Sequence, residues 1–215
     1  MGHRIIVDVV SDIICPWCFI GKRRLERAAA ILGRPIDIRW HPFQLNPGMP
    51  VEGISRREYR TAKFGSWDYS QQLDSRVAEN GNAVGIEFRF DRMERTPNSF
   101  RGHVLLAAAL KQGLEVQNRV AERLFVGYFM NGEDTGDPDV LLAIARECGV
   151  EGDIEDPDLA YRVRNEEKSA RDAGVSGVPL MTYEGSLVSE GAAPEEMLAA
   201  KLREFAPEPH GISER

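Results

Sequence analysis

Two cysteines separated by two residues, Cys15 and Cys18, stand at the junction of two differently patterned segments. Before them, residues 4–10 form a short run dominated by Ile and Val, which predicts a β-strand. After them, apolar residues recur at helical spacing over residues 16–32, with a proline in the first turn and a glycine just past the end. The cysteine pair is therefore expected at the N-terminus of a helix that directly follows a strand.

The rest of the chain predicts a second strand, a long helical region, and then a hairpin with a closing helix. Residues 36–43 alternate apolar and polar side chains, as a strand does. Near the end, Glu184 and Gly185 separate two short β-patterned runs, and residues 193–205 predict the closing helix. The region between predicts helices over residues 55–83, 99–112, 116–131, 138–148 and 158–173. Strands are thus expected only at the two ends of the chain.

Composition and charge exclude several classes of function. The 215 residues include 34 acidic and 27 basic side chains, a net charge of -7, which argues against nucleic acid or an anionic membrane as the main partner. No apolar run reaches the roughly 18 residues of a transmembrane helix, and the N-terminal segment lacks the features of a secretory signal. We therefore expect a cytoplasmic protein that binds neither nucleic acid nor membranes.

The predicted position of the cysteine pair gives it a defined chemistry. Backbone N–H groups at a helix N-terminus lack intrahelical partners and present partial positive charge, which stabilises a thiolate at Cys15. Cys18 follows one turn later, within bonding reach. Cys15 is therefore the expected nucleophile and Cys18 the thiol that resolves a mixed disulfide. A carboxylate at Asp12 opposes the Cys15 thiolate if it faces the sulfur, and we expect Lys22 to offset it.

Two other interpretations of the pair stay open. Cysteine is common as an inert core residue, which is how we interpret Cys148 at the end of an apolar helical run. A structural zinc site usually needs four ligands. Because three cysteines are also too few for a disulfide framework, we favour a redox pair and expect no metal. The remaining candidate zinc ligands are one distant cysteine and four scattered histidines: Cys148, His3, His41, His103 and His210.

Five segments resemble the FrnE-type members of the DsbA family. The resemblance implies an α/β protein, a thioredoxin fold with a large all-helical insertion between its β-α-β and β-β-α halves. It divides the chain into a thioredoxin-like domain, residues 1–46 and 174–215, and a helical insertion domain, residues 47–173. The matching segments are SDIICPWCFIGKRRLE, HPFQLNP, NSFRGH, LFVGYF and GVSGVPLMTYEG, which begin at residues 11, 41, 98, 124 and 174.

The resemblance also implies a substrate platform. Pro179 would be a cis proline beside the active site, with Val178 presenting its backbone to an extended substrate. From the sequence pattern alone, Pro179 would be expected to be an ordinary trans proline at the start of an edge strand. Pro16 and Trp17, between the two cysteines, are expected to contact substrate too. Trp17 carries no cationic charge, so it cannot favour a thiolate as a histidine there could.

Other positions bear on substrate contact and preference. Asn98 and His103 match the family's Asn-x-x-x-x-His pattern. We favour a helix N-cap followed by a packed histidine, with direct contact to substrate as the alternative. Leu180 and Met181 replace the family's usual aromatic pair, and VSEGAAPEEM replaces its usual Ser-Gly-Ala-Gln stretch. These departures leave the preference for particular substrates open.

The favoured function is a thiol-disulfide oxidoreductase, with disulfide isomerisation as a further activity. Its partners would be protein or peptide thiols and disulfides, or small thiols. It would need no cofactor beyond its own redox-active disulfide, with glutathione as a co-substrate. The protein could form a homodimer. The alternative is a glutathione-dependent isomerase of the 2-hydroxychromene-2-carboxylate type, or a kappa-type glutathione transferase. Retention of both Cys15 and Cys18 argues against that alternative. A third reading, a chaperone-like protein, treats the cysteines as incidental.

Overall fold

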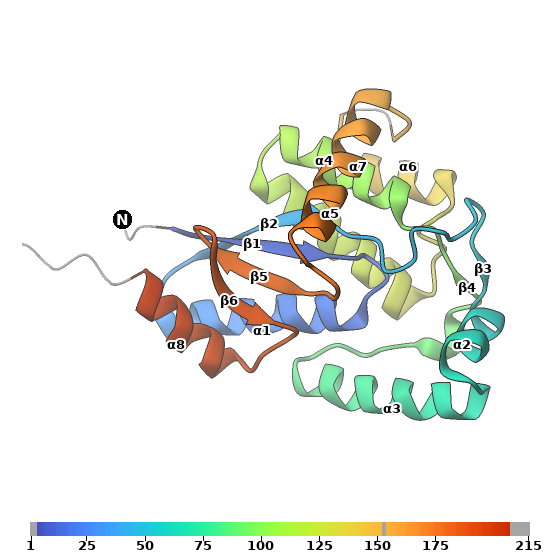
Figure 1. Ribbon diagram of the computed structural model, residues 1–215, viewed down its shortest axis with the longest axis horizontal. Helices are drawn as coiled ribbons and strands as arrows, with labels where there is room; N and C mark the ends of the chain where they lie inside the picture. Colours follow the sequence, from blue (N-terminus) through green and yellow to red (C-terminus); the bar gives the residue numbers. More distant parts are fainter. Residues whose placement is uncertain (1–3, 152–153, 207–215) are drawn as a thin grey trace, which may run out of the picture.

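A four-stranded sheet forms the centre of the protein (Figure 1). The computed structural model describes residues 4–151 and 154–206. The strand order is β2-β1-β5-β6; β1 is parallel to β2 and antiparallel to β5, and β5 is antiparallel to β6. This is the arrangement expected of a β-α-β unit followed by a hairpin. The strands are β1 (Ile5–Ser11), β2 (Ile36–Pro42), β5 (Leu180–Tyr183) and β6 (Ser186–Glu190).

Two helices, α1 (Pro16–Leu32) and α8 (Glu195–Phe205), pack together on one face of this sheet (Figure 1). The predicted bounds of α1 are confirmed. Pro16 occupies its first turn, where the missing N–H costs no helical hydrogen bond. Gly33 ends it with a φ of 65°, a left-handed conformation that favours glycine.

The predicted hairpin is also confirmed. Glu184 and Gly185 connect β5 to β6, and both have positive φ angles, 48° and 79°. Two successive residues with positive φ match the right-handed twist of the flanking strands. Glycine at the second position adopts this conformation at little cost.

The segment between β2 and β5 is an insertion made mostly of helices. Helices α5 and α7 pack against β2, and α2 and α3 form a pair beyond the N-terminal end of α1 (Figure 1). Within the described part of the chain, no helix is long and apolar enough to cross a membrane. The helices of the insertion are α2 (Arg56–Phe64), α3 (Trp67–Ala83), α4 (Phe100–Lys111), α5 (Leu114–Val126), α6 (Pro138–Glu147) and α7 (Pro157–Asp172), with a 3-10 turn at Phe90–Arg92 and a π-helical turn at Gly127–Asn131.

Two helices of the insertion differ from the prediction. The single helix expected over residues 55–83 is two helices, because Gly65 ends α2 and the Ser66 hydroxyl accepts a hydrogen bond from the Tyr69 N–H at the start of α3. The helix expected over residues 116–131 changes to the π-helical turn at Gly127.

The insertion is also not all-helical. Strand β3 (Ile54–Ser55) pairs antiparallel with β4 (Arg95–Thr96). Two-residue strands are too short to show a period in the sequence, which is why the pairing was not predicted.

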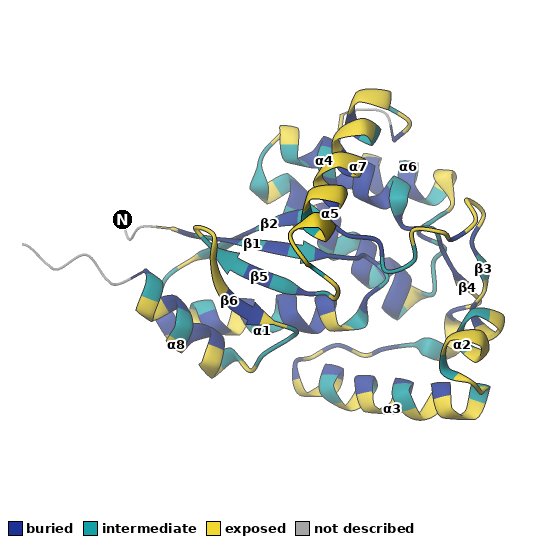
Figure 2. Ribbon diagram, viewed as in Figure 1, coloured by how far each residue is buried: buried dark blue, intermediate teal, exposed yellow. Residues whose placement is uncertain are grey.

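One apolar core joins the insertion to the thioredoxin part. Figure 2 shows buried residues along β1 and on the inward sides of the helices that cover the sheet. Phe19 of α1 stacks on Phe125 of α5 at a ring-centroid distance of 5.2 Å, and Phe88 and Phe129 complete the aromatic cluster. The helix that carries the cysteines is therefore held directly by the insertion.

We predict that Phe125→Ala lowers the free energy of unfolding by about 3–5 kcal/mol, because it leaves a cavity against Phe19 and Trp40. Urea denaturation followed by circular dichroism measures this. Tyr161→Ala, on the exposed side of α7, is the control and should change stability by no more than about 0.5 kcal/mol. A loss below 1 kcal/mol for Phe125→Ala would show that the aromatic cluster does not hold the two parts together.

Candidate active site

Cys15 is the N-cap residue of α1. Its extended backbone (φ -94°, ψ 112°) turns the chain from the end of β1 into the helix, and the Cys18 N–H donates to the Cys15 carbonyl at 3.0 Å. Pro16 favours this start because its fixed φ suits the first helical position. The Cys15 side chain therefore lies at the positive end of the helix dipole, as predicted. Both cysteines are free thiols in this structure.

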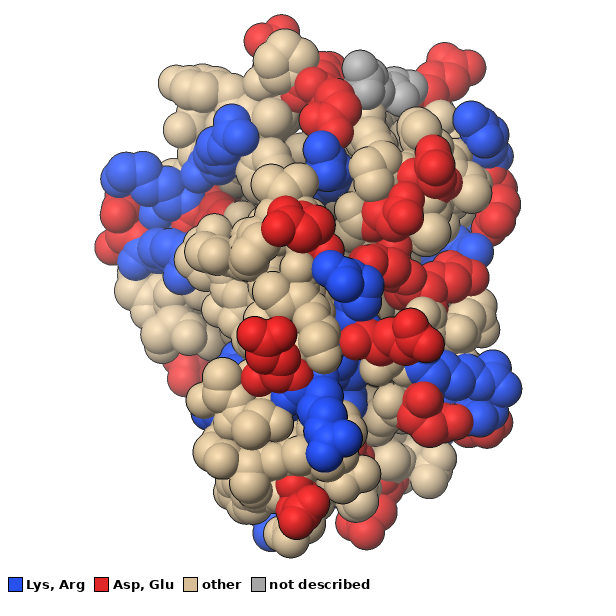
Figure 3. All heavy atoms as spheres, turned by 90° about the vertical axis from the view of Figure 1, so that its right-hand side faces the viewer, with Lys and Arg blue, Asp and Glu red and all other residues tan. Residues whose placement is uncertain are grey.

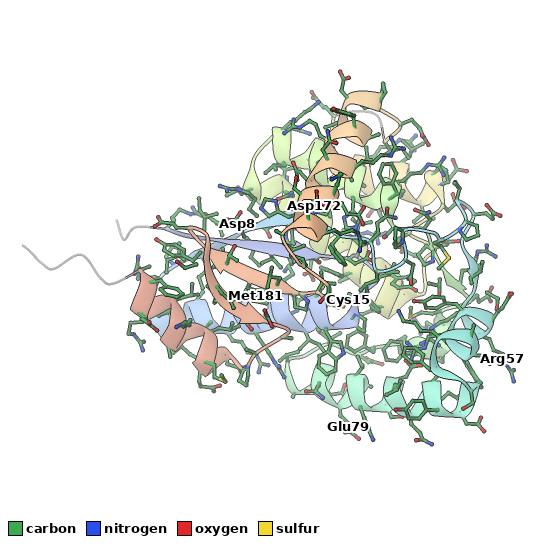
Figure 4. All side chains as sticks on the ribbon, viewed as in Figure 1. Asp8, Cys15, Arg57, Glu79, Asp172 and Met181 are labelled. Atoms are coloured by element: carbon green, nitrogen blue, oxygen red, sulfur yellow. The ribbon has the colours of Figure 1, made fainter. Side chains whose placement is uncertain are left out.

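The loop before β5 completes the site around Cys15. The Cys15 Sγ lies 3.6 Å from the carbonyl oxygen of Val178, although the two residues are 163 positions apart in the chain. The peptide bond between Val178 and Pro179 is cis, as the family resemblance implies. Pairing of β1 with β5 is what brings these segments together. Figure 4 shows Cys15 at this end of the sheet, near the β5 strand that carries Met181.

Cys18 lies in a different environment from Cys15. It is fully buried, and burial raises its pKa well above the ordinary value; the neighbouring Cys15 raises it further. The Ser11 side chain and the backbone of Asp12 partly oppose this rise in pKa. Cys18 is thus held mainly as a neutral thiol behind Cys15.

The Asp12 carboxylate is engaged by groups other than the sulfurs. The side chain is fully buried; Oδ2 accepts from the Leu45 N–H at 2.7 Å, and Oδ1 accepts from the Ile14 N–H at 3.4 Å. Oδ1 also lies 3.4 Å from Nε2 of His103. These contacts tie the loop before Cys15 to the segment after β2 and to α4.

Asn98 and His103 both make structural contacts, but Asn98 is not the N-cap that the favoured interpretation made it, because Ser99 is the N-cap of α4 and Asn98 precedes it. Asn98 Oδ1 accepts from the Phe100 N–H at 2.9 Å, at the start of α4, and its Nδ2 donates to the Met49 carbonyl at 2.7 Å. His103 is buried beside Asp12. Neither residue lines the cavity beside Cys15.

Lys22 does not act on the cysteines by pairing with Asp12. Its ammonium group forms ion pairs with Glu26 on the same helix and with Glu122 of α5, the latter at 2.7 Å. Only 7% of the side chain is exposed. Lys22 thus links α1 to the insertion, next to the aromatic cluster.

A cleft of about 450 Å³ opens beside Cys15. Pro16 and Trp17 form one side of it, and 37% of Trp17 is exposed. The opposite side comes largely from α2 and α3, which the sequence analysis did not place at the site. The spacing of Arg56, Arg60 and Lys63 in the sequence was the available signal, because positions i, i+4 and i+7 of a helix share one face. The basic residues of that side are Arg56, Arg60, Lys63 and Arg76.

Cys148 lies apart from this cleft. It is buried at the end of α6, and burial raises its pKa. The described residues contain no group of three or more His, Cys, Asp or Glu side chains placed to hold a metal ion. Two of the histidines considered as zinc ligands, His3 and His210, lie outside the described residues.

Comparison with known proteins places this geometry in a family. The model of the DSBA-like thioredoxin domain matches residues 6–203. The chain belongs to this family. It is 30% identical over 154 residues to the uncharacterized protein YwbO of Bacillus subtilis (strain 168), a match that covers 68% of this chain and 67% of that protein.

Solved structures of DsbA-like proteins share its fold. A crystal structure described as a probable DsbA oxidoreductase from Streptomyces coelicolor superposes with a TM-score of 0.82 at 26% identity, covering 93% of this chain and 89% of that chain. The cytosolic disulfide reductase DsbM from Pseudomonas aeruginosa gives a TM-score of 0.63 at 19% identity, with 94% and 98% covered. The predicted thioredoxin fold with a helical insertion is confirmed.

We predict that iodoacetamide modifies one thiol, Cys15, in the native reduced protein near neutral pH. Cys15 lines the cleft, whereas burial raises the pKa of both Cys18 and Cys148. Mass spectrometry of peptides after brief labelling measures the modified site. Labelling in denaturant is the control and should modify all three cysteines. Modification of Cys18 at a rate equal to that of Cys15 in the native protein would contradict this assignment.

Proposed function

We propose that the protein is a thiol-disulfide oxidoreductase that exchanges disulfides through Cys15 and Cys18. The observation that carries this proposal is the asymmetry of the two sulfurs. Cys15 lies at the N-terminal end of α1, 4% exposed, where it lines the cleft 3.6 Å from the Val178 carbonyl; Cys18 is fully buried one turn behind it and does not line the cleft. Such an arrangement suits a nucleophile with its resolving thiol.

In the reductive direction, the Cys15 thiolate attacks one sulfur of a substrate disulfide. A bond forms between Cys15 Sγ and that sulfur, and the substrate S–S bond breaks; the second substrate sulfur leaves with the electron pair and takes up a proton. Cys18 then loses its proton and attacks Cys15 Sγ, which releases the first substrate thiol. The substrate has gained two electrons, and the protein holds a Cys15–Cys18 disulfide. A thiol or dithiol donor restores the reduced pair by the same steps in reverse.

A groove beside Val178 supports the proposal of protein or peptide substrates, because an extended chain could pair with the backbone that lines it. A groove of about 380 Å³ runs along residues 173–178 to Gly191, beside the Val178 carbonyl. Because Gly174 and Gly177 place no side chain there, an extended peptide could approach the backbone closely. We propose that Val178 and Pro179 position the chain that carries the reacting sulfur, with Trp17 and Pro16 contacting it from the other side.

Small thiols fit the same chemistry, and we propose glutathione as a co-substrate. A glutathione-dependent isomerase reaction is the alternative, but it gives no role to Cys18, which this structure places directly behind Cys15. We further propose that the protein works in a reducing compartment, the cytoplasm, because its three cysteines include no second pair that could form a structural disulfide.

We predict that Cys18→Ser accumulates a mixed disulfide between Cys15 and its substrate, because the resolving thiol is lost. Intact-protein mass spectrometry after incubation with a peptide disulfide detects the adduct. Cys15→Ser should reduce turnover in an insulin-reduction assay by at least 100-fold, by analogy with loss of a catalytic nucleophile. Cys148→Ser is the matched control; it should keep the turnover of the unmodified protein and should accumulate no mixed disulfide.

The alternative predicts a different pattern. A glutathione-dependent isomerase would keep its turnover in Cys18→Ser and would trap no protein or peptide adduct. Full insulin reduction by Cys15→Ser would exclude the exchange mechanism altogether, since no other described cysteine lines the cleft.

A further inference from the structure

The side of the cleft that faces Cys15 is basic. Four cationic side chains line it, Arg56, Arg60 and Lys63 from α2 and Arg76 from α3, and no acidic side chain lines it within the described part of the chain. In Figure 4, Cys15 lies toward the end of the molecule where α2 and α3 carry the labelled Arg57 and Glu79. A cleft of one charge sign concentrates ligands of the opposite sign.

Two of these cations are held by one carboxylate. Asp74 of α3 receives Arg56 at 2.7 Å on Oδ2 and Arg60 at 2.6 Å on Oδ1. Its side chain is 11% exposed, and that of Arg56 is 5% exposed. The pairing fixes both guanidinium groups but neutralises only one positive charge, so the deep part of the cleft keeps an excess of one.

The other two cations lie at the exposed rim. Among the described residues, neither Lys63 nor Arg76 has a carboxylate within 4.0 Å, the distance of an ion pair. The Lys63 ammonium donates to the Tyr59 hydroxyl at 2.7 Å, an uncharged partner. Both charges therefore stay available to a ligand. With Asp74 included, the cations of the cleft exceed its carboxylates by three.

An unpaired donor lies in the same wall. Asn46 lines the cleft, and its Oδ1 accepts from the Tyr59 hydroxyl at 2.7 Å. Its Nδ2 atom is buried and has no hydrogen-bond partner among the described residues. A buried amide N–H without an acceptor is costly, so the cleft wall beside Tyr59 contains a polar group that the protein itself leaves unsatisfied.

This concentration of positive charge contrasts with the rest of the molecule. The whole chain has a net charge of -7. On the face that carries β3, β4 and α2, basic and acidic side chains are interspersed (Figure 3). The excess of positive charge is therefore local to the cleft, because the protein as a whole is negatively charged and repels anions.

We propose that the cleft selects thiols and disulfides that carry carboxylates beside the reacting sulfur, with Lys63 and Arg76 as the residues that determine this specificity. The inference rests on the proposed exchange reaction at Cys15. A carboxylate on either side of a substrate cysteine would reach the rim cations while the sulfur meets Cys15. Acidic peptides and glutathione share this chemistry, and the experiment below distinguishes them.

The test compares peptide mixed disulfides that differ only in the residues flanking the cysteine: glutamate, glutamine or lysine. The rate of thiol release by an excess of the full-length reduced protein gives the second-order rate constant for each peptide. At low ionic strength we expect the glutamate peptide to react about tenfold faster than the lysine peptide, because steering by charge raises association rates. At 0.5 M NaCl, where charges are screened over a few Å, the ratio should fall toward one.

Charge reversal tests the assigned residues. In the double variant Lys63→Glu, Arg76→Glu, the preference should invert, so that the lysine peptide reacts faster than the glutamate peptide. The matched control, Arg146→Glu with Arg203→Glu, makes the same change in net charge on exposed positions of α6 and α8 and should keep the original preference. The ratio of two rates in one protein does not depend on the folded fraction.

Oxidised glutathione and its carboxyl esters form the second arm. If esterification slows the reaction of glutathione, and the glutamate peptide also reacts faster than the lysine peptide, the protein recognises carboxylates near the sulfur in both kinds of substrate. If esterification slows glutathione but the three peptides react at equal rates, the ligand is a small anionic thiol. Equal rates for all peptides and for both glutathione forms would overturn the inference while leaving the exchange reaction intact. Absence of Cys15-dependent reaction with the glutamine peptide would instead overturn the proposed function, and this inference with it.

Discussion

The buried carboxylate of Asp12 is the interaction on which the placement of the site depends. A buried charge is tolerated only when partners compensate its lost hydration, and here the N–H groups of Leu45 and Ile14 donate to it while Nε2 of His103 lies 3.4 Å from it. Ile14 belongs to the same loop as Asp12, whereas Leu45 and His103 are distant from it in sequence. Removing the carboxylate would leave the loop before Cys15 without its link to the insertion. The position of Cys15 is therefore fixed in part through the hydrogen bonds of Asp12 to Leu45 and Ile14.

The parts of the fold that follow from local sequence were predicted, and the parts that depend on distant pairing were not. Proline and glycine set both ends of α1, and Glu184 with Gly185 sets the hairpin, because turn and cap preferences act within a few residues. The break at Gly65 had a local signal in the following serine, which was missed. The β3–β4 pairing had no signal that a single segment could show, since it needs two segments folded against each other. The basic residues of α2 share one helix face by their spacing, but no single segment could show that this face meets the cysteine motif.

The insertion contributes to the site both through packing and through charge. Its aromatic residues hold α1 in place, and α2 and α3 supply a wall of cations to a cleft whose other wall is the cysteine motif. Long basic side chains can line such a wall because they also lie on aromatic rings, as Arg60 does over Phe64 at 4.6 Å. In the proposed reaction, the thioredoxin part thus carries the two sulfurs, while the insertion carries the groups proposed to distinguish one substrate from another.

In the proposed exchange reaction, the different environments of the two sulfurs set the order of events. Burial raises the pKa of Cys18, so this thiol competes poorly with Cys15 for an incoming disulfide. Once Cys15 is in a mixed disulfide, Cys18 must still lose a proton inside the protein, and the Ser11 side chain and the Asp12 backbone lower its pKa against the effect of burial. Both groups therefore favour the thiolate form of Cys18. Because the Asp12 carboxylate holds this same part of the chain through Leu45 and Ile14, its contacts bear on the position of Cys15 and on the pKa of Cys18 together.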